Sequence, residues 1–186
     1  MYPSHYGYPW HPPVTPVNWD WDQTSWGHHW YPAYYPWYSN WESSWNRVEL
    51  KDYGPHPLAI NIDEATKQNN YYRTALWTGK HLQVTLMSIP VGGDIGLEIH
   101  PDTDQFFRIE DGHGLVQMGA RKDRLDYQAR LNDDYAVMVP AGTWHNIINT
   151  GNEPLKLYSI YAPPHHPHGT VHRTKAAAMA EERHHS

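Results

Sequence analysis

Short runs of alternating apolar and polar residues fill the chain from Asn70 to Tyr161. They are rich in β-branched and aromatic residues and are bounded by Gly, Pro, Asn or Asp, a pattern typical of β-strands. The pattern predicts nine strands, at 72–78, 82–89, 95–99, 105–110, 114–118, 124–131, 135–139, 144–149 and 155–161. So many short strands at close spacing favour an all-β fold, an antiparallel sandwich or barrel.

Helical patterns are few. A short helical turn is predicted near 63–67, and a tail helix is predicted at 174–182. In the tail, Thr174 can cap the first turn, and the alanines from Ala176 to Ala180 favour helix.

The first fifty residues have a different composition from the strand region. They hold eight of the 10 Trp, seven of the 14 Tyr and seven of the 16 Pro, without a sustained helical or strand period. We interpret residues 1–54 as an irregular, low-complexity arm whose aromatic rings require a partner surface. Three interpretations stay open: the arm folds over its own barrel or that of a twin subunit, it adheres to another protein layer, or it stacks on sugar rings.

Composition excludes several function classes. The formal net charge of −6 argues against non-specific binding to nucleic acid, which requires a basic surface. The absence of cysteine excludes disulfides, zinc–thiolate sites and a thiol nucleophile. No 18-residue apolar run predicts a membrane span, and the N-terminus does not have the cationic and apolar regions of a Sec signal peptide.

Potential metal ligands gather in two of the predicted strand regions. Glu98 and His100 are two residues apart, so on a strand they project from the same face. His145 follows a Pro-x-Gly turn at Gly142, and Gln105 begins another predicted strand. A carboxylate, two imidazoles and an amide that converge would suit a divalent ion such as Mn, Fe, Zn or Ni.

These residues resemble the two motifs of the cupin superfamily. The first motif corresponds to Gly92, Glu98, His100, Gln105 and Gly112. The second corresponds to Pro140, Gly142, His145 and Asn149, with Asp134 in place of its first glycine. The resemblance implies a double-stranded β-helix (jelly-roll) barrel at 55–165, a His-rich tail at 166–186 and a homodimer. The chain resembles in particular the small single-domain cupins of the mannose-6-phosphate isomerase-like type.

The first motif departs from the family in two ligands. Glu98 stands where the family has its first histidine, and the neutral Gln105 stands where it has glutamate. One negative charge is therefore retained, with Glu98, His100, Gln105 and His145 as the candidate ligands. The alternatives are a metal-free barrel, or Asp104 in place of Gln105 if the strand register slips by one residue.

Face assignment predicts the walls of a pocket beside the ion. If Gln105 points inward, Phe107 also does, while Phe106 and Arg108 point outward. Phe107 and Ile147, with Tyr158 or Tyr161, would then wall a mostly apolar pocket. For each of the aromatic residues the alternative is core packing, which the pattern favours for Phe107.

Two functions are compatible with this pattern. The first is a metal-dependent enzyme acting on a small polar, sugar-like molecule by isomerase, lyase or oxygenase chemistry, with Glu98 or a nearby histidine moving a proton. The second is a structural protein that assembles through residues 1–50, whose Tyr/Trp/Pro composition resembles that of bacterial spore-coat proteins. The expected location is accordingly the cytoplasm or the spore coat. The histidines of 165–172 either cover the barrel mouth or are solvated.

Overall fold

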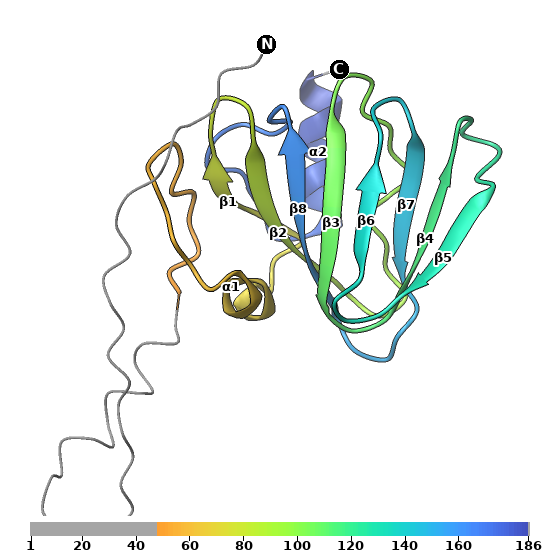
Figure 1. Cartoon of the computed structure of the whole chain (residues 1–186), viewed down its shortest axis with the longest axis horizontal. Coiled ribbons are helices and arrows are strands. Elements are labelled where there is room, and N and C mark those ends of the chain that lie inside the picture. The colour runs from red at the N-terminus through yellow and green to blue at the C-terminus, as the bar shows by residue number, and fades with distance from the viewer. Residues whose placement is uncertain (1–47, 186) are drawn as a thin grey trace, which may run out of the picture. The chain divides into compact units, whose positions relative to one another are not determined.

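Two antiparallel sheets form the core of the computed structural model, which describes residues 48–185. Six strands run in the order β6-β3-β8-β2-β1-β9, and three run in the order β5-β4-β7. The strands are β1 (Arg73–Thr78), β2 (Gln83–Ile89), β3 (Asp104–Asp111), β4 (Gly114–Gly119), β5 (Tyr127–Leu131), β6 (Ala136–Val139), β7 (Trp144–Asn149), β8 (Leu155–Ala162) and β9 (Val171–His172). Figure 1 shows β6 of the larger sheet beside β7 of the smaller one. The predicted all-β, antiparallel fold is confirmed.

One of the nine predicted strands is wrong. Residues 95–99 make no strand. Within them only Glu98 forms an isolated bridge, to His145, and Asp94 just before them forms another, to Ile148. Gly96 interrupts the extended backbone, because its φ is 88°. The two-residue strand β9, by contrast, was not predicted, and it lies in the segment assigned to the tail.

Both predicted helices are present. In α1 (Ile62–Gln68) the side chain of Asn61 accepts a hydrogen bond from the N–H of Glu64 (3.3 Å) and caps the first turn. In α2 (Lys175–His185) the Thr174 hydroxyl accepts from the N–H of Ala177 (3.2 Å), as the sequence indicates. Neither helix of the described chain is long and apolar enough to cross a membrane.

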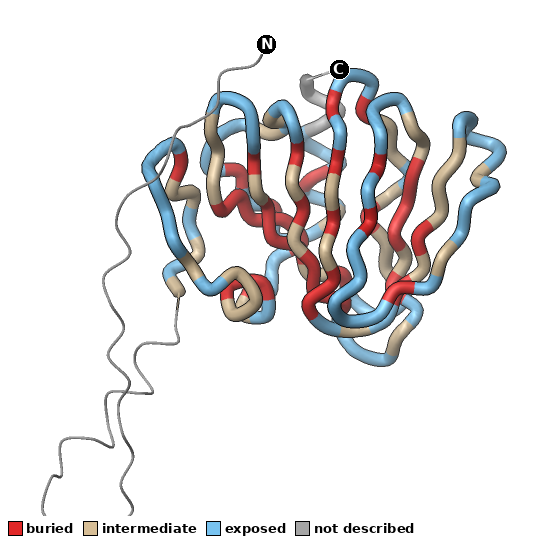
Figure 2. Tube along the Cα trace, in the orientation of Figure 1, coloured by how far each residue is buried: buried red, intermediate tan, exposed pale blue. Residues whose placement is uncertain are grey.

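Apolar side chains from both sheets meet in one core. Phe107, Ile109 and Ile147 are fully buried there, together with Val116 and Leu157. Figure 2 shows long buried stretches along the central strands of the larger sheet and along β7. On β3 burial alternates as predicted, since Gln105 and Phe107 are buried while Phe106 and Arg108 are only half-buried.

A second, smaller apolar cluster covers the opposite face of β1 and β2. Ala65 of α1 packs there with Leu76 and Leu86, and Val48, Leu50 and Tyr53 pack against them. The end of the predicted arm, 48–54, is therefore packed on the sheet. Residues 1–47 lie outside the described residues, so the three interpretations of the arm remain predictions.

Candidate metal centre

Glu98, His100 and His145 meet where the segment after Gly96 runs beside β7. One potential ligand atom of each lies within 4.8 Å of the others. The backbones of Glu98 and His145 exchange two N–H···O=C hydrogen bonds of 3.0 Å. Residues paired in this way project from the same side, so the bridge aims both side chains at one point. The carbonyl of His100 accepts from the N–H of Gly142 (2.8 Å), which fixes the third ligand.

The backbone sets the orientation of the His145 ring. Its Nδ1 lies 2.9 Å from the carbonyl oxygen of Thr143, and because a carbonyl only accepts, Nδ1 donates this hydrogen bond. Nε2 points to the other side of the ring and lies 3.3 Å from Oε1 of Glu98. A proton on Nε2 or a cation between the two atoms would hold them at this distance. A carbonyl behind a ligating imidazole is a common support of metal sites.

The same carboxylate oxygen also faces the second imidazole. Nε2 of His100 lies 3.4 Å from Glu98 Oε1, and His100 and His145 are 7 % and 0 % exposed. The donor set of one carboxylate and two imidazoles in a buried site fits a divalent ion, which Glu98, His100 and His145 would hold. The family pattern and this triad support a divalent metal without identifying it.

The carboxyl of Glu98 is held in its ionised form. Burial by itself would raise the pKa of Glu98, but the contacts with His100 and His145 and the charge of Arg73 outweigh it. The pKa of this carboxyl is therefore well below its usual range. An ionised carboxylate at neutral pH is the form that binds a cation.

Gln105 is buried on the inward face of β3 but its role as fourth ligand stays a prediction. Its amide nitrogen donates to the Ser159 hydroxyl (3.1 Å), and its Oε1 is buried without a hydrogen-bond partner. The alternative ligand Asp104 is exposed and its carboxylate accepts from the N–H of Ala141 (2.8 Å).

The predicted pocket walls divide into two groups. The Phe107 ring centre lies 6.0 Å from that of His145, the Tyr161 ring lies 5.7 Å from that of His100, and Ile147 is buried two residues after His145. Tyr158 was also predicted as a possible pocket wall, and the structure does not place it there. It packs on the opposite face of β8 in the cluster of Leu76 and Leu86, because side chains of a strand alternate between faces.

A cavity of about 650 Å³ opens beside the triad. Glu98 and His100 line it from within, and further lining comes from residues that the motifs do not contain: Leu97, Ile99, Lys122, Trp144, His165, His166, Pro167, His172 and Glu181. Lys122 Nζ lies 5.4 Å from the ring centre of Trp144. Of these residues, sequence reasoning considered only the histidines.

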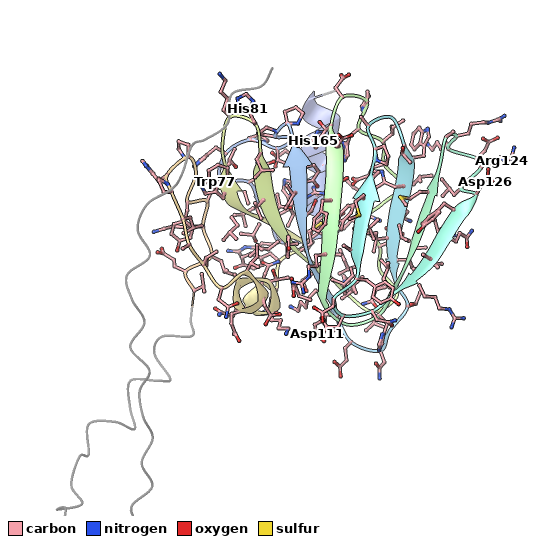
Figure 3. All side chains as sticks on the ribbon, in the orientation of Figure 1. Trp77, His81, Asp111, Arg124, Asp126 and His165 are labelled. Carbon is pink, nitrogen blue, oxygen red and sulfur yellow. The ribbon has the colours of Figure 1, made fainter. Side chains whose placement is uncertain are left out.

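The histidines after β8 form part of this cavity wall. The His165 ring centre lies 4.1 Å from that of His100, and Figure 3 places His165 at the end of the barrel opposite Asp111. Burial lowers the pKa of His165 to about 4, with a smaller contribution from His100. Burial, followed by the charge of Arg73, also lowers the pKa of His166. This arrangement favours the interpretation that the segment covers the barrel mouth.

These two imidazoles predict acid sensitivity of the metal-free protein. Between the ordinary histidine pKa of 6.5 and the folded value of about 4, the unfolded chain binds more protons than the folded one. The free energy of unfolding should therefore fall as pH is lowered through this window. Urea unfolding measured from pH 7 to 4.5 gives the free energy of unfolding as a function of pH. The double variant His165→Gln/His166→Gln should show a smaller change of this free energy with pH, whereas the exposed control His81→Gln should show the same change as the native chain. Equal slopes in all three proteins would contradict the prediction.

Comparisons with known proteins agree with this architecture. Residues 85–161 match a family model described as a cupin domain. The uncharacterized protein YrkC of Bacillus subtilis is 70 % identical over 133 residues, which are 72 % of each chain. A crystal structure from Bacillus halodurans is 68 % identical and covers 70 % of this chain and 99 % of its own, with a TM-score of 0.70.

The fold also recurs at low identity. A crystal structure from Klebsiella pneumoniae, of an uncharacterized protein with a double-stranded β-helix domain, is 18 % identical and has a TM-score of 0.50. It covers 63 % of this chain and 98 % of its own, and it bears on the fold alone. With two antiparallel sheets, the matched domain and these relatives, the chain belongs to the cupin superfamily and has the predicted jelly-roll barrel.

Proposed function

We propose that this chain is a metal-dependent enzyme that acts on a small polar, sugar-like molecule. The observation that carries the proposal is the convergence of ligand atoms of Glu98, His100 and His145 within 4.8 Å of one another, beside a cavity of about 650 Å³. Cavities of this size are typical of small-molecule sites.

The ion, Glu98 and His165 would each have a different role in the reaction. A bound divalent ion would supply Lewis-acid polarisation of substrate oxygens. Glu98, ionised and in contact with both imidazoles, would hold the charge of the site and accept a proton from a substrate placed beside it. His165 lies against His100 and is neutral above about pH 4, so it offers a second proton acceptor on the cavity wall.

Isomerase, lyase and oxygenase chemistry are all compatible with this arrangement. The mannose-6-phosphate isomerase-like type is one form of the proposal. The spore-coat alternative has no support in the described residues or in the comparisons. A homodimer, a protein-layer partner for residues 1–50 and the cellular compartment stay predictions.

Metal analysis of the native protein tests the proposal. The full chain should be purified without an affinity step based on its histidines, because nickel acquired on the column would confuse the result. We expect about one Mn, Fe, Zn or Ni ion per chain by elemental analysis. Protein that emerges metal-free, and that takes up none of these ions in titration calorimetry, would refute the proposed function.

A further inference from the structure

A buried glutamine holds the main chain of the segment that covers the barrel mouth, residues 163–170. Gln83 begins β2 and is 0 % exposed. In the sheet it is paired with Tyr161 of β8, which is paired on its other side with Gln105 of β3. Directly paired residues of antiparallel strands project from the same face. Gln83 therefore lies on the inward face, in the same row as the candidate ligand Gln105.

The side-chain amide of Gln83 is fully used in holding this segment. Its Oε1 accepts hydrogen bonds from the main-chain N–H groups of His165 (3.3 Å) and His166 (2.9 Å). Its Nε2 donates to the carbonyl of His166 (2.9 Å) and to the hydroxyl of Thr78 (2.9 Å). The prolines at 163–164 have no N–H, so the two bound N–H groups are the first that the chain offers after β8.

The same network holds the far end of the covering segment. The Thr78 hydroxyl donates to the carboxylate of Asp52 (2.6 Å). That carboxylate also accepts from the main-chain N–H of Gly169 (2.9 Å). Gln83 and Asp52 therefore fix the main chain of the segment near both of its ends.

The His165 ring projects from this segment and is exposed. Its centre lies 4.1 Å from that of His100 and 5.6 Å from that of Tyr161, on which it stacks. An exposed side chain on a loop keeps one position only if the main chain beneath it is fixed, because ordering a free loop costs conformational entropy. The hydrogen bonds to Gln83 supply that constraint.

We propose that Gln83 is a positioning residue of the metal centre, which acts through His165 by holding its imidazole against His100. The inference deepens the proposed function and rests on it, because His165 is there the second proton acceptor on the cavity wall. A proton acceptor must stay within hydrogen-bond reach of the atom that it serves, so a displacement of about 1 Å is enough to impair it.

NMR of the full-length, metal-free protein tests the position of the ring. In the native chain we expect nuclear Overhauser effects between the ring protons of His165 and His100, because the ring centres are 4.1 Å apart. Gln83→Met has a similar size but forms none of the hydrogen bonds of the amide, so these effects should be lost. General loss of stability would not remove them, since they are measured on the folded molecules.

Thr85→Val is the matched control. Thr85 lies two residues further along β2 on the same face, is buried, and its hydroxyl has no hydrogen-bond partner. This variant should therefore retain the effects between the His165 and His100 rings.

Cobalt-loaded protein tests the consequence for the centre. A paramagnetic Co²⁺ ion in the triad would displace the NMR signals of the rings around it. In the native chain we expect displaced signals for His165 as well as for His100 and His145. In Gln83→Met the displacement of the His165 signals should largely disappear, while the two ligand rings keep theirs.

Several results would overturn the inference. They are ring effects that are absent from the native chain, that persist in Gln83→Met, or that are lost equally in Thr85→Val. Should Gln83→Met not fold, Gln83→Glu provides the comparison, because its carboxylate cannot donate to the His166 carbonyl and the Thr78 hydroxyl. Unchanged ring effects in Gln83→Glu would then overturn the inference. Failure of cobalt to bind would count against the proposed function alone, because the metal-free measurement still decides what Gln83 positions.

Discussion

His145→Ala is expected to lower metal affinity more than about 100-fold, since changes to the supporting residues of metal ligands alone cost 10- to 100-fold. His145 is fully buried, and its Nε2 already faces the carboxylate of Glu98. Titration calorimetry with zinc and manganese measures the effect. His113→Ala is the matched control, because that imidazole is exposed at a turn and contacts Asn132 rather than the triad. Equal affinities in the two variants would show that the ion binds elsewhere.

Glu98→Gln tests the carboxylate ligand of the same triad. The amide is neutral and should bind a divalent ion poorly. The folded protein holds the Glu98 carboxylate ionised, with a pKa well below its usual range, so this group stabilises the fold at neutral pH. We therefore expect the metal-free variant to be less stable than the native chain by about 1–3 kcal/mol, while metal no longer raises its melting temperature. A metal-free variant that is as stable as the native chain, or more stable, would contradict the assigned role of the Glu98 carboxylate.

The convergence of Glu98, His100 and His145 was predicted from sequence even though the strand predicted at 95–99 does not form. Two residues of separation put Glu98 and His100 on one side in any nearly extended segment, and the bridge of Glu98 to His145 is enough to maintain that arrangement. The turn before His145 was recognised from its Pro-x-Gly sequence. The structure shows why glycine stands there, because Gly142 has a φ of 76°. The spacing of residues within each short segment was therefore enough to predict the triad.

Non-local features were missed for a different reason. Tyr158 and Tyr161 are three residues apart on one strand, so they must face opposite sides, and only pairing with β2 and β3 decides which side is inner. The cavity wall formed by His172 and Glu181 depends on β9, whose two residues carry no strand pattern of their own. Pairing partners that lie far apart in sequence leave no local signal.

Phe107→Ala is expected to destabilise the protein by about 3–5 kcal/mol, the usual cost of removing a fully buried aromatic ring. The loss should also weaken metal binding, because the ring packs 6.0 Å from that of His145 and helps to hold it. The only other phenylalanine of the chain is its neighbour Phe106, which is half-buried on the opposite face of β3 and makes a matched control. Chemical unfolding should show a clearly smaller loss for Phe106→Ala, and calorimetry should show native metal affinity. Phe107→Leu fills most of the volume and should recover both stability and affinity in part. If both alanine variants lost stability equally, the inward assignment of β3, on which the site depends, would be contradicted.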